Sequence, residues 1–133
     1  MKVLIAETDW RFAHHARSFL ETRAHFVAFQ TTPAQLLERT QQWRPDLLIL
    51  AAQLAEGGTL ETLMGMKPRP AVLLTEYMDR YDRAWRMWQV GGDEILMKPI
   101  FNNHELHEGI ITAMENAATG ARVWHAAATK ISA

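Results

Sequence analysis

Short apolar runs, each followed by a longer amphipathic stretch, recur along this chain. The clearest run covers residues 47–50, Leu-Leu-Ile-Leu, and it follows the turn signal Arg44-Pro45-Asp46. An unbroken apolar run of this length, bounded by a turn, is typical of a strand that is buried on both faces. Such a strand belongs in a parallel sheet covered by helices on each side, so residues 47–50 form the centre of the predicted fold.

Four further apolar runs predict additional strands, and the stretches between the runs predict helices. The expected strands cover residues 3–6, 26–29, 71–74 and 95–97. The expected helices cover about 10–23, 33–43, a short stretch capped by Thr59, about 79–90, and a last stretch that carries Leu106, Ile110 and Met114. Strand and helix therefore alternate five times in about 118 residues, which predicts an α/β fold: one five-stranded parallel sheet, right-handed crossovers and helices on both faces.

Polar residues at three of the expected helix starts have the character of N-caps. Asp9 precedes the first helix, and Thr32 stands three residues before Gln35, which is the spacing of a capping box. Asn102 and Glu105 have the same spacing before the last helix. These signals place the helix starts independently of the apolar pattern.

Composition limits the possible functions. The chain has 133 residues, of which 48% are hydrophobic, enough for one two-sided core. Its formal net charge is −1, so no general attraction to nucleic acid or to anionic lipid is expected. Cysteine is absent, which excludes disulfides and thiolate metal sites. The apolar run at the start of the chain is too short for a signal peptide or a membrane span, so we expect a cytoplasmic protein.

Several stretches in a fixed order carry a resemblance to a known family. They are VLIAETD (3–9), RPDLLIL (44–50), VLLT (72–75), GGDEILMKPI (91–100) and a closing amphipathic helix. Together they resemble the receiver domain of bacterial two-component response regulators, a CheY-like, flavodoxin-like (βα)5 fold with strand order 2-1-3-4-5. The resemblance implies a receiver-like domain at residues 1–118, followed by a C-terminal tail or linker at 119–133.

The resemblance also implies where the family's chemistry would lie. In receivers, acidic residues after the first strand and an aspartate at the end of the third bind magnesium, and that aspartate accepts a phosphoryl group from a kinase histidine. A threonine or serine after strand four and a lysine before a proline then hold the phosphoryl oxygens. The matching positions in this chain are Glu7, Thr8, Ala51, Thr75 and the pair Lys98-Pro99.

Two of these positions depart from the family in ways that bear on function. Ala51 stands where the acceptor aspartate belongs, and a methyl group cannot form an acyl phosphate. Thr8 replaces a second acidic residue, so Thr8 and Ala51 together remove most of the oxygen ligands of a hard divalent cation, and we expect magnesium binding to be lost or weak, with no other cofactor. The aromatic switch position of strand five falls on Ile95. The sequence therefore predicts a degenerate receiver, or pseudo-receiver, without ordinary phosphotransfer.

The remaining acidic residues leave two questions open. Asp9 is the best placed alternative phosphoacceptor, although an N-cap is its more ordinary role, and Glu56 and Glu76 are expected on loops at the same edge. Lys98 needs a partner if it is buried, because an isolated charge is strongly disfavoured there. We expect Glu7 or Glu76 to pair with it and to fix the site in one state without phosphate; the alternative is a lysine that points outward into solvent.

The fourth predicted helix, at about 79–90, is rich in aromatic and arginine side chains. Its inward stripe is expected to be Ala84, Met87, Trp88 and Gly91, which leaves Tyr81 and Trp85 at the flank or surface. Tyr81, Trp85 and Arg86 have the composition of an interface hot spot on the helix 4–strand 5–helix 5 face, where receivers commonly dock partners or a second receiver. The alternative is that Trp85 covers neighbouring side chains locally.

No pattern supports an enzyme. The pairs His14-His15 and His104/His107 lack a ligand set for a metal, so we expect surface roles and no metal site. The glycine pairs match no phosphate-binding motif. We therefore expect a signalling module that acts through a protein partner or a homodimer, with no direct contact to nucleic acid or membrane. Two alternatives are the regulatory domain of a transcription or antitermination factor, and a receiver that is phosphorylated on a non-standard acid.

Overall fold

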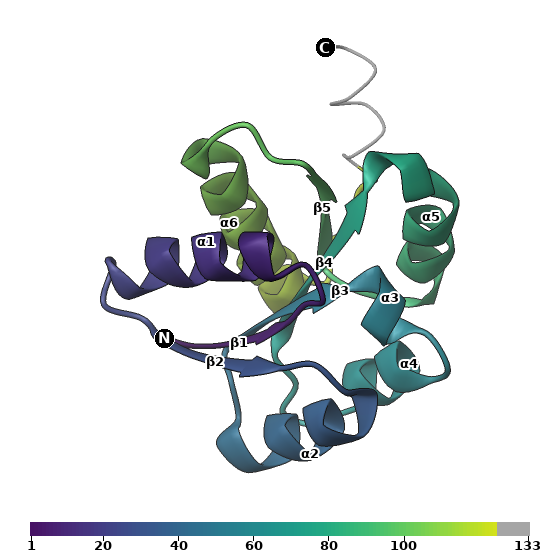
Figure 1. The fold of residues 1–133 in the computed structure, drawn as a ribbon. Helices are drawn as coiled ribbons and strands as arrows, with labels where there is room; N and C mark the ends of the chain where they lie inside the picture. The colour runs from purple at the N-terminus through teal and green to yellow at the C-terminus, as the bar shows by residue number, and fades with distance from the viewer. Residues whose placement is uncertain (125–133) are drawn as a thin grey trace.

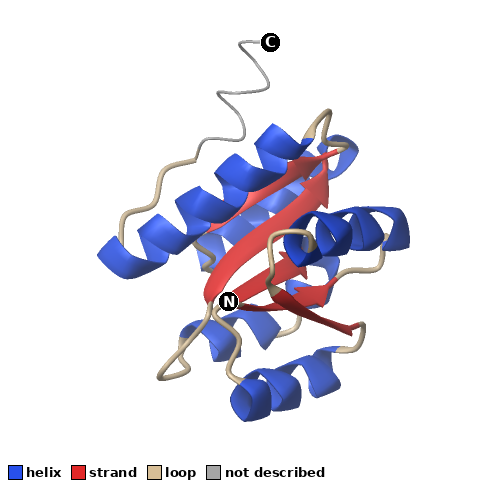
Figure 2. Ribbon diagram, turned by 90° about the vertical axis from the view of Figure 1, so that its left-hand side faces the viewer, coloured by secondary structure: helices blue, strands red, loops and turns tan. Residues whose placement is uncertain are grey.

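A computed structural model of the chain describes residues 1–124 and shows one central sheet between two layers of helices (Figures 1 and 2). The strands are β1 (Lys2–Ala6), β2 (Phe26–Gln30), β3 (Leu47–Ala51), β4 (Ala71–Tyr77) and β5 (Glu94–Lys98). The helices are α1 (Trp10–Glu21), α2 (Pro33–Trp43), α3 (Ala52–Ala55), α4 (Thr59–Met64), the 3-10 turn η1 (Met78–Arg80), α5 (Tyr81–Val90) and α6 (Asn103–Thr119).

All five strands are parallel, in the order β2-β1-β3-β4-β5, which confirms the predicted flavodoxin-like fold. β3 is buried along its whole length, as its unbroken apolar run predicts. Leu47 and Ile49 face the layer of α1 and α6, whereas Leu48 and Leu50 face the layer of α2 to α5. Successive side chains of β3 therefore point to opposite faces of the sheet and contribute to the core on both sides.

Several local expectations need correction. A short helix, α3, which the sequence analysis did not predict, follows β3 directly, so the predicted fourth and fifth helices are α5 and α6. Gly58, with φ of +88°, is the N-cap of α4, and Thr59 is buried in its first turn rather than capping it. Thr32 donates its hydroxyl to the side chain of Gln35, 3.0 Å away, instead of forming the reciprocal backbone bonds of a capping box.

The last helix ends close to the predicted start of the C-terminal tail, and the division into a domain and a tail stays a prediction. α6 continues to Thr119 and stops at Gly120, whose φ of +76° suits a glycine cap. The chain then turns back along the molecule through residue 124. The rest of the predicted tail, residues 125–133, lies outside the described residues. No helix within residues 1–124 is long and apolar enough to cross a membrane.

Candidate functional site

The carboxyl ends of β1, β3, β4 and β5 bring the receiver-equivalent positions together at one edge of the sheet. Glu7 follows β1, and Ala51 ends β3 beside Thr75 of β4 in the strand register. Lys98 ends β5. Ala51, Thr75 and Lys98 are all buried, with at most 4% of their surface exposed. The sequence prediction that these positions share one site is therefore consistent with their placement.

A buried ion pair occupies the centre of this site. Lys98 donates from Nζ to Glu7 Oε1 at 2.9 Å, and the two side chains are only 4% and 1% exposed. Thr75 donates its hydroxyl to the other carboxylate oxygen, Oε2, at 2.7 Å. The lysine is therefore paired with Glu7, one of the two partners expected for it, and does not point into solvent.

Both oxygens of Glu7 are thus engaged by protein donors. The backbone N–H of Asp9 also approaches Oε1, at 3.3 Å. Ala51 offers no oxygen from its side chain, and Thr8 is exposed, with its hydroxyl 3.4 Å from Gln53 Oε1. Mg²⁺ requires an octahedral shell of oxygen ligands, commonly including one or two carboxylates. The side chains at this edge do not fit such a shell while Glu7 is held by Lys98 and Thr75.

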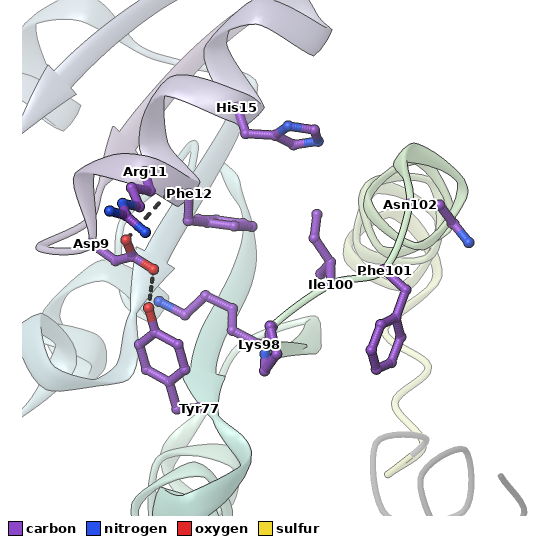
Figure 3. A pocket seen from close by; sticks show the side chains of 10 residues that line it. Asp9, Arg11, Phe12, His15, Tyr77, Lys98, Ile100, Phe101 and Asn102 are labelled. Atoms are coloured by element: carbon purple, nitrogen blue, oxygen red, sulfur yellow. Dashed lines mark hydrogen bonds between the residues drawn. The ribbon is translucent and has the colours of Figure 1, made fainter.

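Tyr77 and Asp9 form a bridge on the outer side of the ion pair (Figure 3). The Tyr77 hydroxyl donates a hydrogen bond to Asp9 Oδ2, and the centroid of its ring lies 4.5 Å from Lys98 Nζ. On the inner side the ring of Phe12 lies 5.2 Å from the same ammonium group. Two aromatic rings therefore flank the Lys98 ammonium group at cation–π distances.

The bridge changes the acidity of both of its members. Burial by itself raises the pKa of Asp9, but hydrogen bonds from Tyr77 and Phe12 N–H, together with the nearby Lys98 charge, bring that pKa below its ordinary value. The same hydrogen bond is the main reason that the pKa of Tyr77 rises to about 12. Asp9 also accepts from Phe12 N at 3.3 Å, so it is the N-cap that the sequence suggested.

A pocket of about 330 Å³ lies beside the bridge, between the first turn of α1 and the β5–α6 connection (Figure 3). Its wall includes Asp9, Phe12, Tyr77, Lys98 and Ile100. Glu7, Ala51 and Thr75 do not line it. Position 51 is therefore not part of the wall of this pocket.

Two other predicted site residues lie away from this centre. Glu76 was expected on a loop, but it belongs to β4 and shares the face of Val72 and Leu74, which points toward α5. Arg83 of α5 binds it through Nε at 2.5 Å. Ile95 is buried in β5 within the same core layer. Glu76 is therefore committed to α5 and does not pair with Lys98.

The remaining predicted positions are placed as follows. Pro99 follows Lys98 through a cis peptide bond, and Glu56 pairs with Arg86 at 2.6 Å on the surface. His104 lies 4.0 Å from Glu108, with both side chains exposed. Within residues 1–124, no group of three or more histidine and acidic side chains is placed to hold a metal ion.

The aromatic face of α5 agrees in part with the prediction. Ala84, Met87 and Trp88 are buried, while Tyr81 and Trp85 remain 45% and 43% exposed. The sequence missed what touches these exposed rings: the indole of Trp124, from the C-terminal segment, lies against them. The only local signal for this contact was an isolated tryptophan beyond the last helix.

Comparison with known proteins supports the fold. No protein-family model matches the sequence, and no curated protein matches it either. Among solved structures, a CheY-like receiver domain from Methanospirillum hungatei matches with a TM-score of 0.70 at 19% identity, covering 90% of this chain and 98% of that one. The receiver domain of Francisella response regulator 1452 matches with a TM-score of 0.69 at 16% identity, covering 86% of this chain and 98% of that one.

A longer protein is also similar in structure. NtrX from Brucella abortus matches with a TM-score of 0.75 at 14% identity over 90% of this chain. The chain spans only 28% of the NtrX chain, so the likeness concerns one domain of that protein. At these identities the matches establish the fold alone. The chain thus has the CheY-like, flavodoxin-like fold of response regulator receiver domains.

Proposed function

We propose that this chain is an atypical receiver-like module of bacterial signal transduction that acts without aspartyl phosphorylation, through contact with a protein partner or a second copy. The observation that carries the proposal is the buried Glu7–Lys98 pair beside Ala51. In receivers a lysine and a hydroxyl hold the phosphoryl group; here Lys98 and Thr75 both hold Glu7. The carboxylate therefore takes the place of an anion that another receiver acquires by phosphorylation.

The proposal includes the loss of magnesium binding. A cation that bound the Glu7 carboxylate would displace Lys98 from it, and the lysine would then be a buried charge without its partner. Breaking a buried pair in this way costs about 3–5 kcal/mol. Because Ala51 and Thr8 supply no carboxylate to offset that cost, we expect no magnesium-dependent chemistry and no enzymatic activity.

The direct test is exposure of the protein to acetyl phosphate and magnesium, followed by intact-mass measurement. We expect no added phosphoryl group on the natural chain. The matched variant is the double substitution Thr8→Asp with Ala51→Asp, which restores two carboxylates at the family positions and should gain some labelling. A stable phosphate on the natural chain would refute the proposal, and its mapping to Asp9 would favour the alternative of a non-standard acceptor.

Output is proposed to pass through the α5–β5–α6 face, which carries Tyr81, Trp85 and Arg86. Exposed tryptophan and tyrosine near an arginine are typical of interface hot spots. Trp85→Ala should weaken self-association or partner capture without changing the fold. Trp10→Ala is the matched control, because Trp10 is 67% exposed at the start of α1. Equal self-association of both variants and the natural chain, measured by sedimentation velocity, would count against self-association through this face.

A second candidate is a regulatory domain within a longer transcription or antitermination factor. It is favoured by the similarity to NtrX, in which the matching domain is one part of a larger chain. The complete coding sequence decides this point, because an output domain would be encoded next to the region described here. Both candidates use the same folded module and share the prediction of no phosphotransfer at position 51.

A further inference from the structure

The chain after α6 makes specific contacts with α5. Arg122 donates from Nε to Gly92 O at 2.7 Å, and from a terminal nitrogen to Gly91 O at 3.0 Å and to Trp88 O. These carbonyls lie at and just beyond the C-terminal end of α5, where backbone acceptors lack helical partners and the helix dipole favours a cation. The guanidinium carbon also lies 3.9 Å from the centroid of a Trp88 ring.

Trp124 makes the second contact, and it extends from Trp88 toward the start of α5. Its ring lies 5.6 Å from Tyr81, 5.2 Å from Trp85 and 5.8 Å from Trp88, centroid to centroid. The first two pairs are edge-to-face, the favoured geometry for aromatic rings. The indole Nε1–H also donates to the Tyr81 hydroxyl at 3.0 Å.

The intervening residue shows that the contact is made by alternate side chains. Val123 is 58% exposed, whereas the residues on either side of it bind α5. Tyr81, Trp85 and Trp88 are spaced along one stripe of the helix, so they form a continuous aromatic surface for a single indole. The surface thus fits an extended arginine-x-tryptophan sequence, with the arginine at the helix end and the tryptophan along its side.

We propose that residues 122–124 are an intramolecular ligand of the α5 aromatic surface, defined by Tyr81, Trp85 and Trp88, and that they regulate its use. When the segment is docked, it covers part of the rings that a partner would contact, and Tyr81 and Trp85 remain 45% and 43% exposed. A partner that uses these rings must displace it, and the same surface then accepts a peptide with the same arginine-x-tryptophan chemistry. This inference rests on the proposed use of the α5–β5–α6 face for protein contact.

The docking itself can be tested by NMR on the full chain. Trp124→Ala should shift the backbone amide signals of Tyr81, Trp85 and Trp88, and remove one indole signal. Val123→Ala is the matched control from the same segment and should leave the α5 signals unchanged. Trp124→Phe should restore part of the natural pattern, because a ring is kept. Unchanged α5 amides in Trp124→Ala would overturn the docking, whatever the function of the protein.

The regulation can be tested with a fluorescein-labelled peptide of the sequence 119–124, added to full-length variants. In the natural chain, the tethered segment competes at an effective concentration of about millimolar, so the peptide should bind poorly. The double variant Arg122→Gln with Trp124→Ala vacates the surface and should bind at least about ten times more tightly. Adding Trp85→Ala to that variant should abolish the gain.

The outcomes separate this inference from the proposed function. Equal or undetectable peptide binding by the natural chain and the double variant would overturn the exchangeable-ligand proposal. Phosphorylation by acetyl phosphate would refute the proposed function without affecting either the NMR or the peptide result. Peptide capture by the double variant, together with unchanged self-association on Trp85→Ala, would confirm the docking site and reject self-association as its use.

Discussion

The Glu7–Lys98 pair gives the sharpest quantitative prediction. Glu7→Gln keeps the shape of the side chain and removes its charge, so that Lys98 is left as a buried cation without the carboxylate to which it is bonded. Removal of one partner from a buried pair costs about 3–5 kcal/mol of the free energy of unfolding. With a urea dependence of about 1–3 kcal/mol per molar, the unfolding midpoint should fall by roughly 1–5 M at pH 7.

The chain provides a matched control for this experiment. Arg17 Nε and Glu21 Oε1 are also 2.9 Å apart, but their side chains are 44% and 46% exposed. Glu21→Gln should therefore change the free energy of unfolding by less than about 1 kcal/mol, as is usual for exposed pairs. The two substitutions are chemically identical, and burial is the main difference between the two sites.

A double substitution distinguishes pairing from mere burial. Glu7→Gln combined with Lys98→Met removes both charges, and it should be more stable than Glu7→Gln alone, because no unpaired cation remains. The assay is equilibrium urea unfolding followed by circular dichroism. If Glu7→Gln loses no more stability than Glu21→Gln, or if the double variant is no better than the single one, the reasoning that Glu7 balances a buried lysine is wrong.

Two further predictions follow from the Tyr77 bridge and from a tight glycine. The raised pKa of Tyr77, about 12, makes its contribution to stability complete below about pH 10 and lost as pH rises toward about 12. The pKa of Asp9 is lowered from its unfolded value of 3.8, so its interactions stabilise the fold fully above about pH 3.8. This stabilisation is lost as the pH falls through the pKa of Asp9 in the folded protein. In ultraviolet titration, Tyr77→Phe should remove a tyrosinate step near pH 12; a variant that keeps this step would contradict the bridge. Gly92→Ala should cost at least about 1–3 kcal/mol in urea unfolding, because φ is +92° and the added Cβ would lie 2.8 Å from Leu74 Cδ1; a neutral result would contradict this packing.

Local sequence patterns determined most of the architecture. The apolar run 47–50 identified the central strand, and the caps at Asp9 and Asn102 placed the starts of α1 and α6. Such signals are local, because burial on both faces and satisfaction of the first helical N–H groups depend on neighbouring residues. The absence of an acidic side chain at Ala51 is likewise a fact of the sequence alone.

Tertiary structure alone decided which charged groups meet. Glu7 and Lys98 are 91 residues apart, and both Glu7 and Glu76 were possible partners from the sequence. Lys98 pairs with Glu7 and not with Glu76 because β4 continues to Tyr77. Side chains alternate between the two faces of that strand, so Thr75 points toward Glu7 and Glu76 points toward Arg83.

The contact of residues 122–124 with α5 also could not be predicted from the sequence. Arg122 binds backbone carbonyl groups, and every residue has one, so no residue type marks the acceptor. Trp124 contacts the rings of Tyr81, Trp85 and Trp88 only because the chain turns back after α6 and runs along α5. The sequence thus determined the elements and the alanine at position 51, whereas the packing of distant segments decided the partner of Lys98 and the contact of Trp124 with α5.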